Sequence, residues 1–376
     1  MSLKPLKEYE TQLYGCRFCP MCKPASEVGG VTAQESHSTR GRALMLWRIA
    51  KGLGNYSPRD AEIIYQSTLD SISESWCVNH YTVSEHILAA RRELVEKGLV
   101  PKPVEAALDR TMLQGKLPAE DTVLLAAEIA ELGEESYLDN ALKALNAVGV
   151  KAGGFLAPVG TLAYALGDSK QARKQAENVC NQLVDGGVKK VITDGPQTLA
   201  SLQAMFPRLG VELPQTVKIS SLSIVLGNAV AGGTTSYILS EGTKVFWQDS
   251  RSLFALAEEL AGDQVLQPSW SKEECYSGSG KVYDLPRELL DYLGLKRVFS
   301  VWSKTLSKSS GADDGLWLTY PSLASRLAEQ RLSHCLERGA SLLLTESPLD
   351  AWWLKKVAEN KKNCPQIFWL PEIFIT

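Results

Sequence analysis

The chain has 376 residues, of which 22% are charged and 44% hydrophobic, and its formal net charge is −3. This length predicts two or three domains, each able to bury a core of its own. The small net charge gives no electrostatic case for nucleic acid, so no nucleic-acid partner is expected. The first ten residues lack an apolar signal core, and no run reaches the ~18 apolar residues of a transmembrane segment. We therefore expect a cytoplasmic protein without a transmembrane segment.

Three of the eight cysteines stand in a tight run near the start of the chain. Two residues separate Cys16 from Cys19 and Cys19 from Cys22, so one irregular loop can turn three thiolates towards the same centre. Bacterial ferredoxins bind a [4Fe–4S] cluster with the run C-x2-C-x2-C-x3-C, whose fourth cysteine ligates the other cluster of a two-cluster domain. Ser26 stands at that fourth position. A cluster on this loop therefore needs its last ligand from elsewhere.

The missing ligand is predicted by counting backwards from the next cysteine with the same spacing. Starting from Cys77, this count lands on Ser67, Asp70 and Ser73, so a second run has kept only its fourth cysteine. If the fourth cysteine of each run ligates the cluster of the other run, one site would consist of positions 26, 67, 70 and 73. We call this the erased site, because none of its four positions is a cysteine. This crossed ligation also predicts one complete [4Fe–4S] site, whose four ligands are Cys16, Cys19, Cys22 and Cys77.

Two other interpretations of these cysteines stay open. Structural zinc sites combine cysteine pairs or add a nearby histidine, and both His80 and His86 follow Cys77. The other interpretation is a set of ordinary buried thiols without metal. The remaining cysteines are scattered, which is typical of a reducing compartment, and we expect buried or incidental thiols at Cys180, Cys275, Cys335 and Cys364.

Helical patterns follow the cysteine loop. A helix packed beside the cluster is predicted by the apolar side chains of Leu44, Trp47 and Ile49. Residues 58–77 and 86–97 predict further helices. Residues 98–118 contain three prolines and two glycines and predict a linker, so the first domain is placed at residues 1–118.

Beyond the linker, the chain repeats a unit of strand, turn and helix. Residues 187–202 match residues 339–354 at a constant offset of 152, for example 345 − 193 and 348 − 196. A further helix is predicted before each strand, at 168–184 and 323–337. Such units form parallel sheets covered by helices. They predict two duplicated α/β halves, placed at residues 119–240 and 241–376.

Ligands of parallel sheets bind at the carboxyl ends of the strands. In the two repeats these ends are residues 193–198 and 345–350. Asp313 and Asp314, which lie between the repeats' predicted strands, are interpreted as part of a polar loop. Core packing is expected for the aromatic C-terminal region, which contains Trp352, Trp353 and Trp369. The alternative is an exposed patch for a partner subunit.

The cysteine loop, the duplicated unit, and the segments Ser38-Thr-Arg-Gly-Arg-Ala-Leu44 and Ala90-Arg-Arg-Glu-Leu-Val-Glu-Lys-Gly98 together resemble one family. These are iron–sulfur proteins with a ferredoxin head and two CCG domains. The family includes the heterodisulfide reductase D-type subunit, the glycolate oxidase iron–sulfur subunit and the small subunit of anaerobic glycerol-3-phosphate dehydrogenase. The resemblance implies an α-helical, ferredoxin-like head followed by two duplicated α/β halves of the CCG type.

The chain departs from this family at its metal ligands. Each half of the family carries a CCG triplet and a later cysteine pair. Here the triplets fall at Pro158-Val159-Gly160 and Ser309-Ser310-Gly311, the pairs at Gly195/Thr198 and Ser347/Asp350, and an HDPC-like segment at 248–251. Both glycines are kept while every thiolate is replaced, and neutral Ser and Pro are poor ligands for iron. We therefore expect the CCG fold without CCG clusters, and no heterodisulfide reduction.

These observations predict an electron-transfer subunit with one [4Fe–4S] cluster and no catalytic residue of its own. The resemblance implies a flavin-containing dehydrogenase subunit as partner, and a further iron–sulfur subunit as a second one. The alternative is a structural or assembly scaffold of an oxidoreductase complex, in which the cluster mainly holds the head together.

Overall fold

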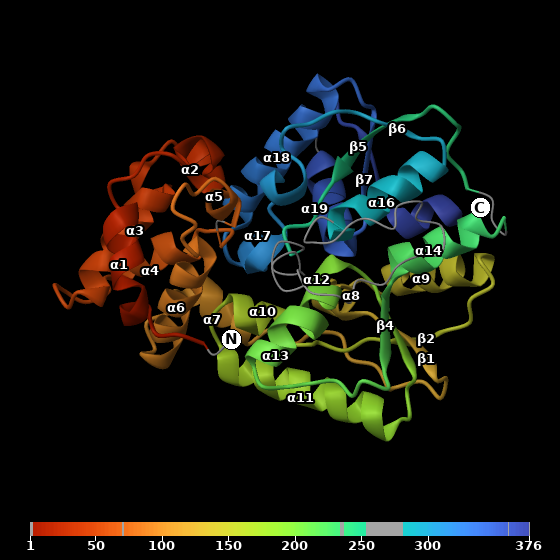
Figure 1. Cartoon of the computed structure of the whole chain (residues 1–376), viewed down its shortest axis with the longest axis horizontal. Coiled ribbons are helices and arrows are strands. Elements are labelled where there is room, and N and C mark those ends of the chain that lie inside the picture. Colours follow the sequence, from red (N-terminus) through yellow and green to blue (C-terminus); the bar gives the residue numbers. More distant parts are fainter. Residues whose placement is uncertain (1–2, 70, 234–236, 253–280, 360, 376) are drawn as a thin grey trace.

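The computed structural model describes residues 3–69, 71–233, 237–252, 281–359 and 361–375. The helical head (residues 1–118) lies at one end of the molecule, and the first half (119–240) and the second half (241–376) lie together beside it (Figure 1). None of the described helices combines the length and the apolar character that crossing a bilayer requires.

The head is built from helices joined by short turns. Its α-helices are α1 (Glu10–Cys16), α2 (Glu27–Thr32), α3 (Thr39–Ala50), α4 (Pro58–Tyr65), α5 (Ser71–Ser75), α6 (Val83–Glu96) and α7 (Lys102–Leu108). The predicted helical character of the head is thus confirmed, whereas its likeness to a ferredoxin stays a prediction.

Two details of the head differ from the sequence predictions. Helix α3 buries Ala43 and Leu46, while Leu44, which was expected to pack, is 49% exposed. The apolar pattern was correct for a helix but did not identify its inner face. The expected linker contains α7, whose Val104 and Ala107 are buried in the core of the head.

The first half contains a parallel sheet with the strand order β2-β1-β3-β4. The strands are β1 (Thr122–Leu125), β2 (Gly153–Phe155), β3 (Lys190–Thr193) and β4 (Lys218–Ser221). Its helices are α8 (Ala127–Leu132), α9 (Glu135–Ala147), α10 (Thr161–Ala165), α11 (Ser169–Asp185), α12 (Pro196–Ala200), α13 (Phe206–Arg208) and α14 (Leu222–Ala231).

The second half has the equivalent strand order, β6-β5-β7-β8, again parallel. The strands are β5 (Lys244–Gln248), β6 (Lys296–Arg297), β7 (Leu342–Thr345) and β8 (Gln366–Trp369). The helices described in this half are α16 (Lys281–Tyr292), α17 (Leu316–Thr319), α18 (Pro321–Glu337) and α19 (Pro348–Ala358).

The internal duplication is confirmed element by element. Strand β7 begins 152 residues after β3 (342 − 190), and α18 begins 152 residues after α11 (321 − 169). Both of these helices have 17 residues. Prolines begin both α12 and α19, where the missing N–H of proline costs no hydrogen bond.

The two halves share a hydrophobic core. Buried side chains of β1, α8 and α9 belong to the same cluster as those of β5, β7 and α19. At this contact the rings of Tyr137 and Trp369 lie 5.6 Å apart. Trp353 and Trp369 are buried, which confirms the core packing expected for the aromatic C-terminal region. The carboxyl ends of β3 and β7 are thereby held close to each other.

Candidate functional site

The three cysteines of the predicted run surround the carboxyl end of α1. Cys16 is the last residue of this helix, and the following chain turns back sharply. The N–H of Cys19 donates to the Cys16 carbonyl (3.0 Å), and the N–H of Ser26 donates to the Cys22 carbonyl (3.1 Å). Cys16 and Cys22 are buried and Cys19 is half-buried. One short loop thus presents the three thiols, as the spacing predicts.

The segment that carries Cys77 packs against this loop. The Cys77 Sγ accepts a hydrogen bond from the backbone N–H of Tyr81 (3.3 Å). Tyr81 lies against Gly15, where an added Cβ would come within 2.6 Å of the tyrosine hydroxyl. On the other side, α5 contacts the short turn η2 (Lys23–Ala25), which directly follows Cys22. Segments on both sides of Cys77 therefore contact both ends of the cysteine loop.

This arrangement can be compared with the metal centres that the sequence predicts. A zinc ion needs ligands about 2.0–2.3 Å from a single point. In the part of the chain that the structure describes, no three His, Cys, Asp or Glu side chains form a group of this kind. A [4Fe–4S] cluster instead binds each thiolate to a different iron. The structure brings the Cys77 segment against the loop, but among the described residues the four thiols do not form a ready metal-binding group.

The histidines near Cys77 have other surroundings. The Nε2 atom of His86 lies 2.8 Å from the amide oxygen of Gln12, and the ring packs edge-on against Tyr9. Burial lowers the pKa of His86 to about 4. His80 is exposed. His86 is therefore a neutral side chain of the core of the head.

The positions of the erased run are buried close to the loop. Ser26, Ser67 and Ser73 are 3%, 0% and 0% exposed, respectively. Among the described residues, the hydroxyls of Ser26 and Ser67 have no hydrogen-bond partner, an arrangement that costs free energy inside a protein. The segments that carry them are joined by a hydrogen bond from the Thr68 hydroxyl to the Glu27 carboxylate (2.6 Å). Asp70 lies outside the described residues.

The structure also brings together the segments that the resemblance aligns with the second set of CCG ligands. The Ser310 hydroxyl donates to the Asp350 carboxylate. The Gln248 amide donates to the Lys308 carbonyl (3.1 Å), which joins the end of β5 to the same loop. Hydrogen-bonded side chains thus fill the space at the carboxyl ends of β5 and β7.

Buried carboxyl groups gather where the two halves meet. Glu128, in the first turn of α8, accepts hydrogen bonds from the Ser347 hydroxyl (2.6 Å) and from the Gln197 N–H (2.7 Å). Burial raises the pKa of Glu131 to about 7, that of Asp194 to about 6 and that of Glu346 to about 7. Near neutral pH these groups can therefore hold protons.

The strand-end ranges 193–198 and 345–350 expected for ligands include Asp194 and Glu346, but the sequence analysis did not name these carboxyl groups. Asp194, Asp249 and Glu346 each directly follow a predicted or observed apolar strand, which is the signal that would have indicated them. The expected polar loop was wrong for Asp313, which is buried and accepts a hydrogen bond from Ser309. Burial raises the pKa of its neighbour Asp314 to about 7, with the Asp313 charge as a further cause.

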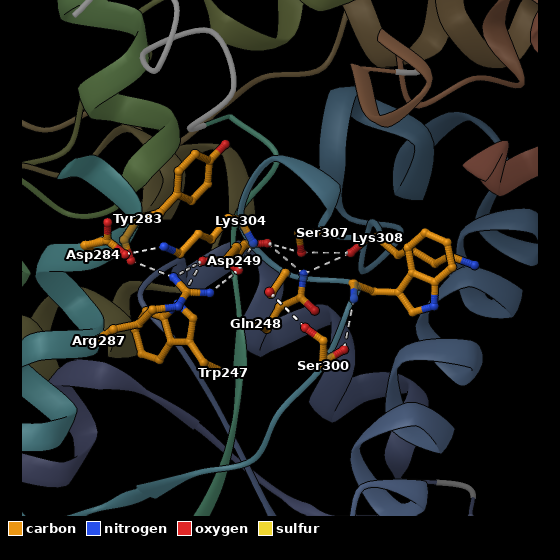
Figure 2. Close-up of polar contacts among 12 residues, drawn as sticks. Trp247, Gln248, Asp249, Tyr283, Asp284, Arg287, Ser300, Lys304, Ser307 and Lys308 are labelled. Carbon is orange, nitrogen blue, oxygen red and sulfur yellow. Dashed lines mark hydrogen bonds and ion pairs between the residues drawn. The ribbon is translucent and has the colours of Figure 1, made fainter. Parts of the chain in front are cut away.

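A cavity of about 630 Å³ opens beside β6 and α16. Arg287 and Lys304 line this cavity and contact Asp249, which is buried behind them. Asp249 accepts two hydrogen bonds from Arg287 (2.7 and 2.6 Å) and one from the Lys304 N–H (2.7 Å), as Figure 2 shows. The Lys304 ammonium pairs with Asp284, and at the rim Arg297 pairs with Asp291. Each of these three cations is already paired with a carboxylate, so the cavity is poorly suited to an anionic ligand.

The scattered cysteines that the structure describes are buried or half-buried free thiols, as predicted. Cys180 and Cys335 are buried in α11 and α18, and burial raises the pKa of the Cys335 thiol to about 12. Cys364 is half-buried. Cys275 lies outside the described residues.

Neither a family model nor a curated protein matches the chain. A solved structure with a similar fold is the crystal structure of a hypothetical protein from Helicobacter pylori. The two share 13% identity with a TM-score of 0.57, and the alignment covers 97% of this chain and 74% of that one. At this identity the similarity concerns the mixed α/β fold alone, since one fold hosts many functions.

Proposed function

We propose that this protein is an electron-transfer subunit that carries one [4Fe–4S] cluster. Its ligands are Cys16, Cys19, Cys22 and Cys77. The observation that carries the proposal is the packing of the Cys77 segment against both ends of the cysteine loop. When bound, such a cluster accepts and donates electrons, at potentials that span roughly −700 to +450 mV among proteins.

The surroundings of the cysteines suit thiolate ligands. The Tyr81 N–H donates to the Cys77 Sγ, and hydrogen bonds of this kind stabilise negative charge on sulfur. Arg42 is buried and lines the same small cavity as Cys16, so its positive charge is close to that thiol. The burial of Cys16 and Cys22 limits the access of water.

We further propose a flavin-containing dehydrogenase subunit as the electron donor, in a cytoplasmic complex that can include a second iron–sulfur subunit. This part of the proposal is supported by the sequence resemblance. Substrate oxidation then belongs to the flavin partner, and this chain receives and passes on the electrons.

A scaffold subunit is the second candidate function. It is favoured by the hydrogen bonds that replace the aligned CCG ligands, such as Ser310 to Asp350 and Ser347 to Glu128. The first contact lies within the second half, and the second joins the two halves without metal. In a scaffold, assembly of the complex would persist without the cluster.

The test is the metal content of anaerobically purified protein and of its Cys77→Ser variant. We expect about four irons and matching acid-labile sulfide per chain, and an EPR signal of the reduced protein that Cys77→Ser abolishes or alters. Cys364→Ser is the matched control, because Cys364 is also half-buried and stands outside the proposed ligand set.

Three other outcomes would change the conclusion. Zinc without sulfide would overturn the electron-transfer function. About eight irons would mean that the erased site still binds a cluster. A Cys77→Ser variant that lacks the cluster but retains the partners and the activity of the complex would favour the scaffold.

A further inference from the structure

Exposed apolar side chains are concentrated around the proposed cluster ligands. Twelve large hydrophobic side chains are exposed in the described part of the chain, and four of them stand within two residues of a ligand cysteine. These four are Tyr14 (56% exposed), Phe18 (70%), Met21 (53%) and Val78 (58%). With Leu44 on the neighbouring α3, they form what we call the cysteine-loop patch. Such gathering of apolar side chains is typical of interaction sites.

Arg17 holds part of this patch in a fixed arrangement. Its guanidinium lies 3.7 Å from the ring centre of Tyr14, 4.4 Å from that of Phe18 and 4.1 Å from that of Trp47. These cation–π contacts join α1, the cysteine loop and α3. The structure gives Arg17 no ion pair with a described carboxylate, so its charge remains available to a partner.

The edge of the patch carries more positive than negative charge. Lys23 and Arg40 both pair with the carboxylate of Glu35, which is shared between them. Hydrogen bonds from Arg40, Lys23 and Ser38 lower the pKa of Glu35 to about 2, so it stays ionised. With Arg17, which contacts the rings of the patch, the patch and its edge carry three cations and this one carboxylate. A complementary partner surface would carry carboxylates around an apolar centre.

The position of the patch leaves it accessible. Helices α1 and α3 lie on the side of the head that faces away from the two α/β halves (Figure 1). The patch therefore combines an exposed apolar centre and a positive edge with side chains next to the ligand cysteines in sequence.

We propose that the cysteine-loop patch is the docking surface for an acidic, flavin-carrying electron-transfer protein. This inference rests on the proposed function, because electrons would pass between the flavin and the cluster behind the patch. The partner's carboxylates would steer its approach to Arg17, Lys23 and Arg40, and its apolar centre would cover Phe18 and Met21. Redox encounters of this kind bury small interfaces, below about 1,200 Å².

The test uses the iron-loaded protein and two electron donors, reduced flavodoxin as an acidic flavin protein and reduced methyl viologen as a small molecule. In the variant Phe18→Ser/Met21→Ser, we expect the second-order rate with flavodoxin to fall about tenfold while the rate with methyl viologen is unchanged. Arg17→Gln should lower the flavodoxin rate at low salt and weaken its salt dependence. Phe299→Ser is the control, since Phe299 is 80% exposed on the second half.

The outcomes separate this inference from the proposed function. Protein without iron and sulfide would overturn both. A loaded wild type that flavodoxin does not reduce, or a double variant that it reduces as fast as the wild type, would overturn only the docking surface. A dimer in sedimentation that Phe18→Ser/Met21→Ser dissociates would overturn the redox partner in favour of a second copy of this chain.

Discussion

Gly160 and Gly311, the glycines aligned with the CCG triplets, have a structural role at the scale of single residues. Their φ angles are 97° and 90°, in the left-handed region that favours glycine. A Cβ on Gly160 would lie 2.5 Å from the carbonyl oxygen of Ala172 in α11, and one on Gly311 would meet the carbonyl of Ala324 in α18. Both positions therefore require glycine, because the backbone there packs closely against a helix.

We expect Gly160→Ala to lower the free energy of unfolding by about 2 kcal/mol or more, since it adds a backbone clash to the left-handed φ. The measurement is urea unfolding at equilibrium. Gly339→Ala is the control, because Gly339 has a φ of 73° but no atom within 4 Å of the added Cβ. It should cost only about 1 kcal/mol. Equal losses in the two variants would contradict a role for close packing.

At the scale of elements, buried polar contacts fasten the head to the second half. Glu27, the first residue of α2, accepts a hydrogen bond from Thr68 in the head (2.6 Å) and another from the Ser309 N–H in the second half. Arg251 donates to the Ser307 carbonyl (2.8 Å) and to Ser71 of α5. Burial opposes the charge of Arg251, but the carboxylates of Glu27, Asp313 and Asp314 raise its pKa.

Glu27→Ala should therefore lower the free energy of unfolding by about 3 kcal/mol, because it removes one of three carboxylates that stabilise the buried charge of Arg251 and leaves the Thr68 hydroxyl without its acceptor. The contact with Ser309 is lost as well, so we expect the head to unfold before the two halves. Urea unfolding followed by tryptophan fluorescence, combined with limited proteolysis, measures both effects.

The control for this prediction is Glu10→Ala, which removes only a surface pair with Lys51 and should cost at most about 1 kcal/mol. A Glu27→Ala variant that unfolds in a single transition, at the midpoint of the wild type, would show that these contacts do not hold the head in place.

At the scale of the whole molecule, buried carboxyl groups with raised pKa values lie where the two halves meet. Burial raises the pKa of Glu131 from 4.5 to about 7. Between these values the folded protein binds a proton that the unfolded chain has released. The contribution of Glu131 to stability is therefore present below about pH 4.5, falls as the pH rises to about 7 and then stays constant.

Glu131→Gln should remove this contribution, since the amide is uncharged at every pH and its oxygen can still accept from Gln197. We expect the stability of the variant relative to the wild type to increase by about 2–3 kcal/mol between pH 4.5 and pH 8. Urea unfolding over this pH range measures the difference. Glu135→Gln, on the exposed part of α9, should give a curve parallel to that of the wild type, and a parallel curve for Glu131→Gln would refute the prediction.

The sequence by itself determined the features that depend on local pattern. Apolar runs that end at Thr193 and Thr345, each followed by a proline that starts a helix, were sufficient to predict β3, β7 and the duplication. The spacing of Cys16, Cys19 and Cys22 was sufficient to predict one loop with three thiols. In both cases the information lies within a few neighbouring residues.

Only the tertiary structure decided which side chains are buried and which distant segments meet. Leu44 is exposed although it is apolar, because α3 packs on a different face. Glu128 is buried although it is charged, because Ser347, 219 residues later in the chain, donates a hydrogen bond to it. Burial of a polar group depends on partners that the fold supplies from elsewhere, and a local pattern contains no record of them.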